Sequence, residues 1–258
     1  MSFTESLPDR LRASGIHLAG SSLLFVIYIY LVLVNWYPEP FFTIEGAIQV
    51  TVTLIGVDLV VGPLLTFVVY VKNKKGLKFD LSLIIITQLA FLLWGIWVTY
   101  KEHPVYTVFS IDQFHVMRAG PTRSFAIEPH VFAGQPKYGL RMVYALPPQN
   151  EKDKQALIRE LILGRGDIYN LSERYRNIRD YRKAVIAKSR DINKIMQARP
   201  DIHSDMDSIL ERYENASLAD FVYLPIEARK KYYTLVLKKT DLSYAGYLDV
   251  DAWVYDES

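Results

Sequence analysis

The stretch LIGVDLVVGPLLTF, residues 54–67, places a single acidic side chain, Asp58, inside a long apolar run. The apolar residues extend over 46–71, and Asp58 is the only charge among them. A run of this length is long enough to cross a bilayer, which requires about 20 residues. An ionised carboxylate at the centre of such a helix costs roughly 3 kcal/mol. The stretch therefore predicts a membrane-spanning helix in which the acid faces the interior of a helix bundle or a partner rather than lipid.

Two more apolar runs flank this stretch, at 16–37 and at 81–100. No side chain between Arg12 and Glu39 carries a fixed charge. Three buried core helices of a water-soluble protein are the alternative, but these runs have almost no polar face for water. The sequence therefore predicts a three-helix N-terminal transmembrane bundle within residues 1–100.

The charges of the chain are segregated. Residues 1–100 hold six basic and six acidic side chains, whereas residues 101–258 hold twenty-four and twenty-two. This contrast predicts a membrane anchor followed by a soluble domain over 101–258. The chain contains no cysteine, which excludes disulfides, zinc thiolate sites and cysteine nucleophiles.

Lysine and arginine predict the orientation of the spans. The first connection, PEPFFTIEG, has no basic residue, whereas the second, KNKKGLKFD, has four. Basic connections stay in the cytoplasm. We therefore expect the N-terminus and the second connection inside the cell, and everything after Tyr100 outside the cytoplasm. The residues on which this topology depends are Arg10, Arg12, Lys72, Lys74, Lys75 and Lys78.

Asp58 is the candidate functional residue. At helical spacing Thr51, Asp58, Gly62 and Leu65 lie on one side of the span. Gly62 allows close approach of another backbone, and Pro63 removes a helix donor and frees a carbonyl. Two interpretations are open: an internal hydrogen bond that orients the spans, or a docking site for the membrane helix of another protein. A proton or ion path is disfavoured, because no Lys or Arg lies within the spans.

Short β-branched and aromatic runs after Tyr100 predict strands. A hairpin is expected from 105–109 and 114–117, a third strand at 141–146, and C-terminal strands at 220–224, 232–239 and 246–253. Helices are expected between them, over about 150–215. The fold class is therefore an α+β extracytoplasmic domain with an antiparallel sheet of about six strands and a helical insert.

Two or three antiparallel helices are expected in the insert. Asn150 begins the first, whose apolar stripe is Leu157, Ile158, Leu161 and Ile162. A long basic helix follows over about 171–199, with apolar residues at coiled-coil spacing. Ser204 caps a short helix to about Glu214. The basic helix has two interpretations, a solvated face or a surface for anionic headgroups or an acidic partner.

No motif for catalysis, metal binding or a cofactor stands out. The histidines do not form H-E-x-x-H, and neither G-x-S-x-G nor a P-loop is present. His17 alone makes no metal site, and we expect it at the membrane interface. The Arg-Gly-Asp tripeptide at 165–167 is expected to be a loop that ends a helix. The sequence therefore predicts a protein that is not an enzyme.

Four segments, GIHL (15–18), WYP (36–38), GVDLVVGPLLT (56–66) and PVYTVFSIDQFHVM (104–117), carry a family resemblance. They resemble the type IV pilin accessory proteins of the TfpX/TfpZ family over about residues 10–120. The segment FVYLPIEARKKYYTLVLKKTDLSYAG (221–246) is similar to that family's C-terminal strands.

The resemblance implies a bacterial inner-membrane protein with a periplasmic domain. Its implied role is in pilus assembly, extension or retraction, and hence in twitching motility. The implied partners are a cognate major type IV pilin and the pilus assembly machinery; no nucleic acid and no catalytic residue is implied. A membrane-anchored periplasmic sensor is the alternative, although the short N-terminus and the KNKKGLKFD connection offer little cytoplasmic output.

Overall fold

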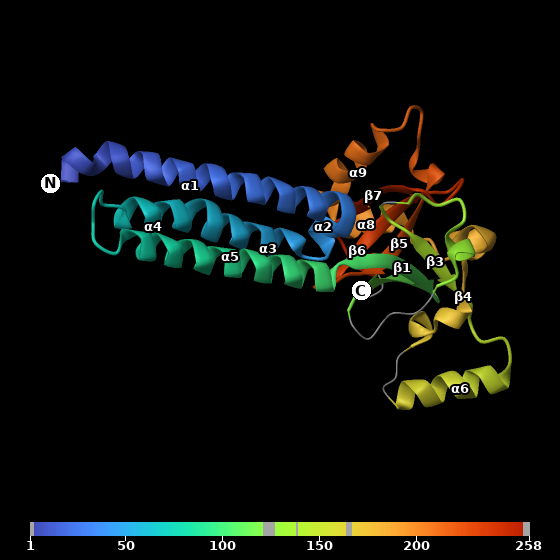
Figure 1. The fold of residues 1–258 in the computed structure, drawn as a ribbon. Helices are drawn as coiled ribbons and strands as arrows, with labels where there is room; N and C mark the ends of the chain where they lie inside the picture. Colours follow the sequence, from blue (N-terminus) through green and yellow to red (C-terminus); the bar gives the residue numbers. More distant parts are fainter. Residues whose placement is uncertain (1–2, 121–126, 138, 164–166, 255–258) are drawn as a thin grey trace. The chain divides into compact units, whose positions relative to one another are not determined.

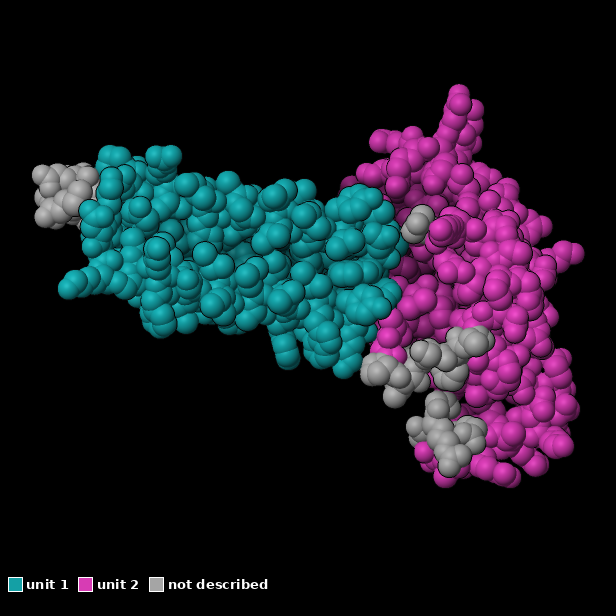
Figure 2. Space-filling model, in the orientation of Figure 1, with its two compact units in different colours: residues 1–38, 46–103 teal, residues 39–45, 104–258 magenta. Residues whose placement is uncertain are grey.

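The computed structural model of the chain describes residues 3–120, 127–137, 139–163 and 167–254. It divides into two compact units (Figures 1 and 2). Unit 1 comprises Met1–Pro38 and Gly46–His103, and unit 2 comprises Glu39–Glu45 and Pro104–Ser258. The segment that connects the first two long helices thus belongs to the second unit.

Within the described residues, unit 1 contains three apolar helices long enough to cross a membrane, Leu7–Trp36, Ala47–Val69 and Leu77–Glu102. The first is α1 (Phe3–Leu31) continued by the π-helical turn η1 (Val32–Trp36). The second joins α3 (Ala47–Leu54), the π-helical segment η2 (Ile55–Val61) and α4 (Gly62–Val69). The third is α5 (Leu77–Glu102). The prediction of three such helices is confirmed.

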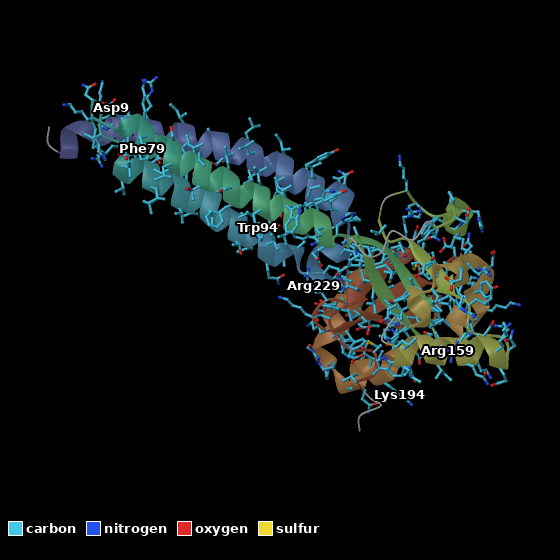
Figure 3. The ribbon with its side chains drawn as sticks, turned by 60° about the horizontal axis from the view of Figure 1, so that its bottom comes forward. Asp9, Phe79, Trp94, Arg159, Lys194 and Arg229 are labelled. Carbon is cyan, nitrogen blue, oxygen red and sulfur yellow. The ribbon has the colours of Figure 1, made fainter. Side chains whose placement is uncertain are left out.

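The first helix begins well before the predicted residue 16. Its polar N-terminal part stays helical because it packs along the end of α4, where Arg10 Nη1 donates to the carbonyls of Phe67 and Val68 at 3.3 and 3.0 Å. Large apolar side chains point outward along the helices, among them Phe79 and Trp94, which are 71% and 65% exposed (Figure 3). Such a continuous apolar surface is typical of helices that lie in lipid.

One end of unit 1 is closed by hydrogen bonds to α5. Tyr28 and Tyr37 are buried, and their hydroxyls lie 3.2 Å from the side-chain and main-chain oxygens of Thr99. The middle helix packs tightly against α5 at Gly95, where an added Cβ would lie 2.8 Å from Leu54. The three helices are therefore joined firmly at the end that contains Trp36 and Thr99.

Unit 2 contains a seven-stranded sheet within its described residues, in the order β4-β3-β1-β2-β5-β6-β7 (Figure 1). The strands are β1 (Pro104–Ser110), β2 (Gln113–Arg118), β3 (Met142–Ala145), β4 (Tyr175–Asn177), β5 (Phe221–Glu227), β6 (Tyr232–Lys238) and β7 (Tyr244–Leu248). The predicted hairpin and the predicted third and C-terminal strands are confirmed, although β7 begins and ends earlier than expected.

The expectation of an antiparallel sheet is met in part: among the described residues four strand pairings are antiparallel and two are parallel, so the sheet is mixed. The hairpin β1–β2 lies at the centre, and β3 and β5 pair with it in parallel on either side. Parallel neighbours need long crossover connections. The chain supplies them between Arg118 and Met142, and between Asn177 and Phe221.

The prediction of one long helix over 171–199 is wrong. This region forms β4 and two short helices, α7 (Arg182–Ile186) and α8 (Ile192–Ala198). Tertiary bonds interrupt the helical pattern: Arg190 N–H donates to the carbonyl of Tyr223 at 2.8 Å, and Tyr223 N–H donates to Ser189 Oγ at 2.9 Å. Asp191 then caps α8 through Asn193 N–H. The apolar repeat reflects burial in separate elements rather than one helical face.

The other helices of the insert are partly as expected. Asn150 caps α6 (Glu151–Ile162) by accepting from Asp153 N–H at 2.9 Å. Its apolar stripe is not buried, because Ile158, Leu161 and Ile162 are exposed and only Leu157 packs against the core; in Figure 1, α6 projects from the sheet. The last helix, α9 (His203–Leu210), begins before the predicted cap Ser204. Of the loop predicted at 165–167, the first two residues lie outside the described residues, and Asp167 caps the 3₁₀ helix Ile168–Asn170.

Among its described residues, unit 2 has two apolar core clusters. One packs α8 and α9 against β5, β6 and β7, and the other packs β1, β2, β3 and β4 against nearby turns. The short helix α2 (Phe41–Ile44) adds the buried side chains of Phe41 and Ile44. The remaining turns are 3₁₀ helices at Pro129–Phe132, Ile168–Asn170, Ser172–Arg174, Ile178–Tyr181, Pro200–Ile202 and Leu218–Asp220.

Candidate functional site

Asp58 lies in the π-helical segment η2, midway along the second long helix. π-Helical turns are rare and occur often at functional sites, because the extra residue in the turn alters which side chains face inward. Here Thr51, Asp58 and Thr66 are buried, whereas Leu65 is 43% exposed. The prediction that Leu65 shares the face of Asp58 is therefore wrong, since it assumed a regular α-helix.

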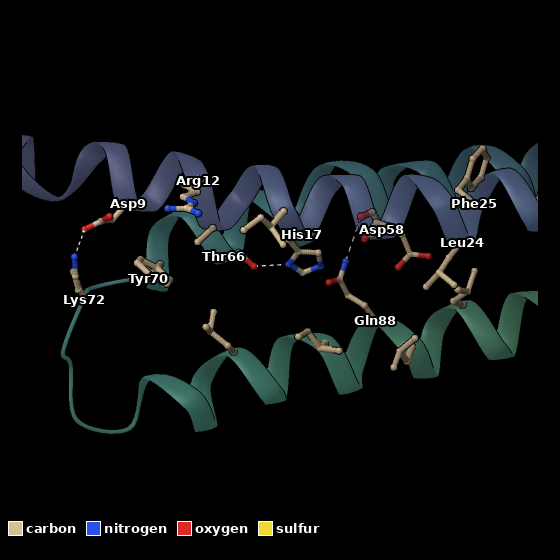
Figure 4. Close-up of a pocket in the computed structure, with 18 residues that line it drawn as sticks. Asp9, Arg12, His17, Leu24, Phe25, Asp58, Thr66, Tyr70, Lys72 and Gln88 are labelled. Atoms are coloured by element: carbon tan, nitrogen blue, oxygen red, sulfur yellow. Dashed lines mark hydrogen bonds and ion pairs between the residues drawn. The ribbon is translucent and has the colours of Figure 1, made fainter.

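The carboxyl group of Asp58 lines a cavity of about 740 Å³ between the three long helices (Figure 4). Asp58 is only 5% exposed. Neither of its carboxyl oxygens has a hydrogen-bond partner among the described residues, and the side-chain oxygen of Gln88 is also buried without one. Buried polar atoms of this kind are rare in native proteins and call for an explanation. Three buried acceptor oxygens, two of Asp58 and one of Gln88, therefore lack a donor among the described residues.

Gln88 of α5 holds the backbone next to Asp58. Its Nε2 lies 3.2 Å from the carbonyl of Val57 and 3.5 Å from that of Asp58. A Cβ added to Gly62 would lie 1.8 Å from Gln88 Nε2. Gly62 therefore makes room for Gln88, not for another backbone as expected. The sequence signal for Gln88 is a lone amide in the apolar run at 81–100, a residue type that bonds neighbouring helices in membranes.

Two side chains of α1 bind α4 beside the cavity. Ser14 Oγ donates to the carbonyl of Pro63 at 2.8 Å, and His17 Nδ1 lies 2.6 Å from Thr66 Oγ1. His17 was expected at the membrane interface, but the apolar helix begins earlier, so this residue lies well inside it. Its ring lines the cavity together with Asp58 and Gln88 (Figure 4).

One end of the cavity is charged and its walls are largely apolar. Asp9 and Lys72 lie at the charged end, with 3.6 Å between Oδ2 and Nζ, and Arg12 and Tyr70 line the same end (Figure 4). The walls further in include Leu24, Phe25, Leu89 and Leu92 from α1 and α5.

Of the residues predicted to form an intramembrane partner site, only Asp58 lines the cavity; Thr51, Gly62 and Pro63 do not. Thr51 instead donates to the carbonyl of Ala47 at 2.9 Å within its own helix. Among the described residues, no group of three or more His, Cys, Asp or Glu side chains is placed to bind a metal ion. An apolar cavity with one buried acid is suited to non-covalent recognition of an apolar segment that presents a hydrogen-bond donor.

Comparison with known proteins identifies relatives. The family model of the fimbrial assembly protein FimB matches residues 5–46. The fimbrial assembly protein of serogroup I from Dichelobacter nodosus is 34% identical over 111 residues, which cover 42% of this chain and 43% of that protein. The serogroup E1 protein is 33% identical over the same shares of both chains. The aligned residues thus span less than half the length of these two relatives.

The fimbrial assembly protein of serogroups C1 and C2 from the same organism is 33% identical over 111 residues, which cover 42% of this chain and 85% of that protein. No solved structure matches the chain. The identity extends over most of the serogroup C1 and C2 protein, and the family model matches the first long helix that lines the cavity. The chain therefore belongs to the family of fimbrial assembly proteins.

Proposed function

We propose that this protein is a non-enzymatic accessory factor of type IV fimbrial, or pilus, biogenesis that holds the membrane helix of its cognate fimbrial subunit in the cavity around Asp58. The observation that carries this proposal is the buried carboxyl of Asp58, which has no partner among the described residues although it lines an apolar cavity between the long helices. Family membership supports a role in fimbrial assembly, because the relatives are named for that process.

A membrane helix is the occupant that fits this chemistry best. Leu24 and Leu89 line the cavity from α1 and α5 and remain 42% and 41% exposed, so they offer apolar surface to an incoming helix. Helices in lipid associate by close packing and by hydrogen bonds between them, and an intramembrane acid normally faces such a partner. Docking would give Asp58 the donor that it lacks.

The proposed location is the bacterial inner membrane, with the N-terminus and the lysine-rich connection in the cytoplasm and unit 2 in the periplasm. The support is the distribution of basic residues: Arg10 and Arg12 precede the first span, and Lys72, Lys74, Lys75 and Lys78 lie between the second and third. In this orientation unit 2 is on the side of the membrane where the fimbria is extended.

Site-directed photocrosslinking tests the docking. A photoreactive side chain at Leu24 or Leu89 should capture the fimbrial subunit of the same organism. Val26 and Phe91 are matched controls, since they lie on the same two helices, are 60% and 54% exposed and do not line the cavity. Equal capture from all four positions, or none from the cavity positions, would contradict the proposal.

Complementation tests the role of Asp58. Deletion of the gene should remove surface fimbriae, and the wild-type protein should restore them. Asp58→Ala should restore few, whereas Asp58→Asn, which keeps one acceptor oxygen, should restore an intermediate number. Thr53→Ala is the matched control, because Thr53 is an exposed polar residue on the same helix. Normal fimbriae in the deletion strain would exclude the proposed function.

A further inference from the structure

Four residues other than glycine have a positive φ angle in the described part of the chain: Asn73, Ile111, Asn215 and Leu242. Asparagine tolerates this conformation. Leu242, with φ of 60°, is only 1% exposed, so burial of its side chain offsets the strain. Ile111 has the same backbone strain, with φ of 62°, but its side chain is 65% exposed.

Ile111 occupies the turn of the central hairpin. Ser110 and Gln113 pair across β1 and β2, and Asp112 N–H donates to the carbonyl of Ser110 at 2.7 Å. A two-residue hairpin turn with positive φ at its first position favours glycine there. A β-branched residue is the least suited to it, because its side chain crowds the backbone. An exposed isoleucine in this place weakens the fold and gains no burial in return.

The turn is linked to the rest of unit 2 through Asp112. Asp112 Oδ2 lies 3.6 Å from Arg190 Nη2. The guanidinium of Arg190 in turn lies 3.2 Å from the ring centroid of Trp253, and the backbone N–H of Arg190 donates to the carbonyl of Tyr223 in the core. The tip of the hairpin, Ile111 and Asp112, is therefore linked through Arg190 to Trp253 and to β5.

The tip lies at one end of the sheet. β1 starts at Pro104, directly after α5, and its seven residues carry the chain about 20 Å before the turn. At the other end of the hairpin, Arg118 is bonded to Glu45, which is close in sequence to α3. Ile111 thus lies at the end of the sheet opposite both segments through which unit 2 is joined to the long helices.

We infer that Ile111 is a contact residue that inserts into an apolar depression on the folded, extramembrane part of the fimbrial subunit. The identity of this partner rests on the proposed function. A strained and exposed apolar residue at a hairpin turn is suited to filling a pocket on a protein, where single side chains dominate binding. One isoleucine is too little apolar surface to anchor a domain to lipid.

The test uses the full-length protein, co-expressed with the fimbrial subunit of the same organism and co-purified in detergent. Ile111→Gly and Ile111→Asn relieve the strain and remove the apolar side chain. They should raise the midpoint of thermal unfolding and weaken capture of the subunit about tenfold, as expected for a contact residue of central importance. Ile111→Val keeps both the strain and the apolar character and should behave like the wild type.

Leu242→Gly is the matched control for strain, because Leu242 has almost the same φ angle but is buried. It should lower the unfolding midpoint. A diazirine side chain at position 111 identifies what the tip touches: crosslinks to the subunit support the inference, and crosslinks to a second copy of this chain or to lipid contradict it. Ile111→Gly that captures the subunit within twofold of the wild type would also overturn it.

These outcomes are separable from those of the cavity. Subunit capture at Leu24 and Leu89 without any at position 111 would overturn the role of Ile111 alone. Loss of capture at the cavity positions of the wild-type protein would instead count against the proposed function.

Discussion

Arg118 binds Glu45 through two parallel contacts, Nε to Oε2 at 2.7 Å and Nη2 to Oε1 at 3.2 Å. Glu45 is 1% exposed and also accepts from Arg229 N–H at 3.1 Å. Burial raises the pKa of the Glu45 carboxyl, and the hydrogen bond and charge of Arg118 oppose this shift in part. The pair binds the segment Glu39–Glu45, which connects the first two long helices, to the rest of unit 2.

Glu45→Ala should therefore destabilise unit 2 by about 1–3 kcal/mol, because it leaves Arg118 and the Arg229 N–H without their buried acceptor. The free energy of unfolding from denaturant titration of the full-length protein in detergent measures this. Glu151→Ala is the matched control, since Glu151 and its partner Lys154 are exposed; it should change stability by less than about 1 kcal/mol. An unchanged unfolding midpoint for Glu45→Ala would show that the pair contributes nothing.

The stability of unit 2 should decrease as the pH falls below about 6.5, the ordinary pKa of histidine. His115 stacks on Tyr169 at 3.9 Å between ring centroids, and its Nδ1 lies 2.8 Å from Glu227 Oε2. Burial lowers the pKa of His115, and Glu227, Asp167 and Asp112 oppose this shift in part. The unfolded chain then binds more protons than the folded one, so stability is complete above the unfolded pKa and is lost as pH falls through it.

His115→Gln should flatten this dependence between about pH 7 and 5. Thermal unfolding midpoints at several pH values provide the measurement, and His130→Gln, at an exposed histidine, is the control that should keep the decrease. A decrease that persists in His115→Gln would assign it to other groups.

Gly62→Ala should displace the side chain of Gln88, because the added Cβ would lie 1.8 Å from Nε2. The contact of Gln88 with the Val57 carbonyl would be lost, which costs about 1 kcal/mol in a buried setting. Gly56→Ala is the control in the same π-helical segment, since a Cβ there meets nothing within 4 Å. Unfolding in mixed detergent micelles compares the two; equal stability of both variants would contradict the role assigned to Gly62.

Tyr37→Phe should destabilise unit 1 by about 1 kcal/mol, because it removes the hydroxyl that donates to the Thr99 carbonyl at 3.2 Å. Tyr30 is 60% exposed, so Tyr30→Phe is the matched control and should have little effect. The same micellar unfolding measures both changes. If the two variants unfold alike, the closed end of the helices does not depend on this hydrogen bond.

The sequence predicted the three long helices because their apolar runs exceed what a soluble core needs, and it predicted Asp58 because a lone acid in such a run is conspicuous. It missed the π-helical segment, since the insertion of one residue per turn leaves no periodic signal of its own. That shift moved Leu65 outward and Thr66 inward. Gln88 was overlooked although its amide interrupts an otherwise apolar run.

In the second unit the strands were predictable from β-branched and aromatic runs, but their pairing was not. Nothing local indicates that Phe114 of β2 pairs with Ile226 of β5, more than a hundred residues later. The prediction of a helix over 171–199 was wrong for a related reason. Its apolar spacing is helical, yet long-range bonds from Ser189 and Arg190 to Tyr223 fix the backbone in another conformation.

The order of the strands also determines when the domain can be completed. The hairpin at the centre of the sheet is synthesised first, directly after the third long helix, but its two sides gain neighbours only when Met142 and Phe221 have been made. Both edges are open to pairing with other chains until β3 is made, and the edge of β2 stays open until β5 is made. Chains that stop before Phe221 should thus keep their long helices but have an incomplete sheet that is prone to aggregate. Formation of the last strands therefore protects the protein from aggregation during synthesis.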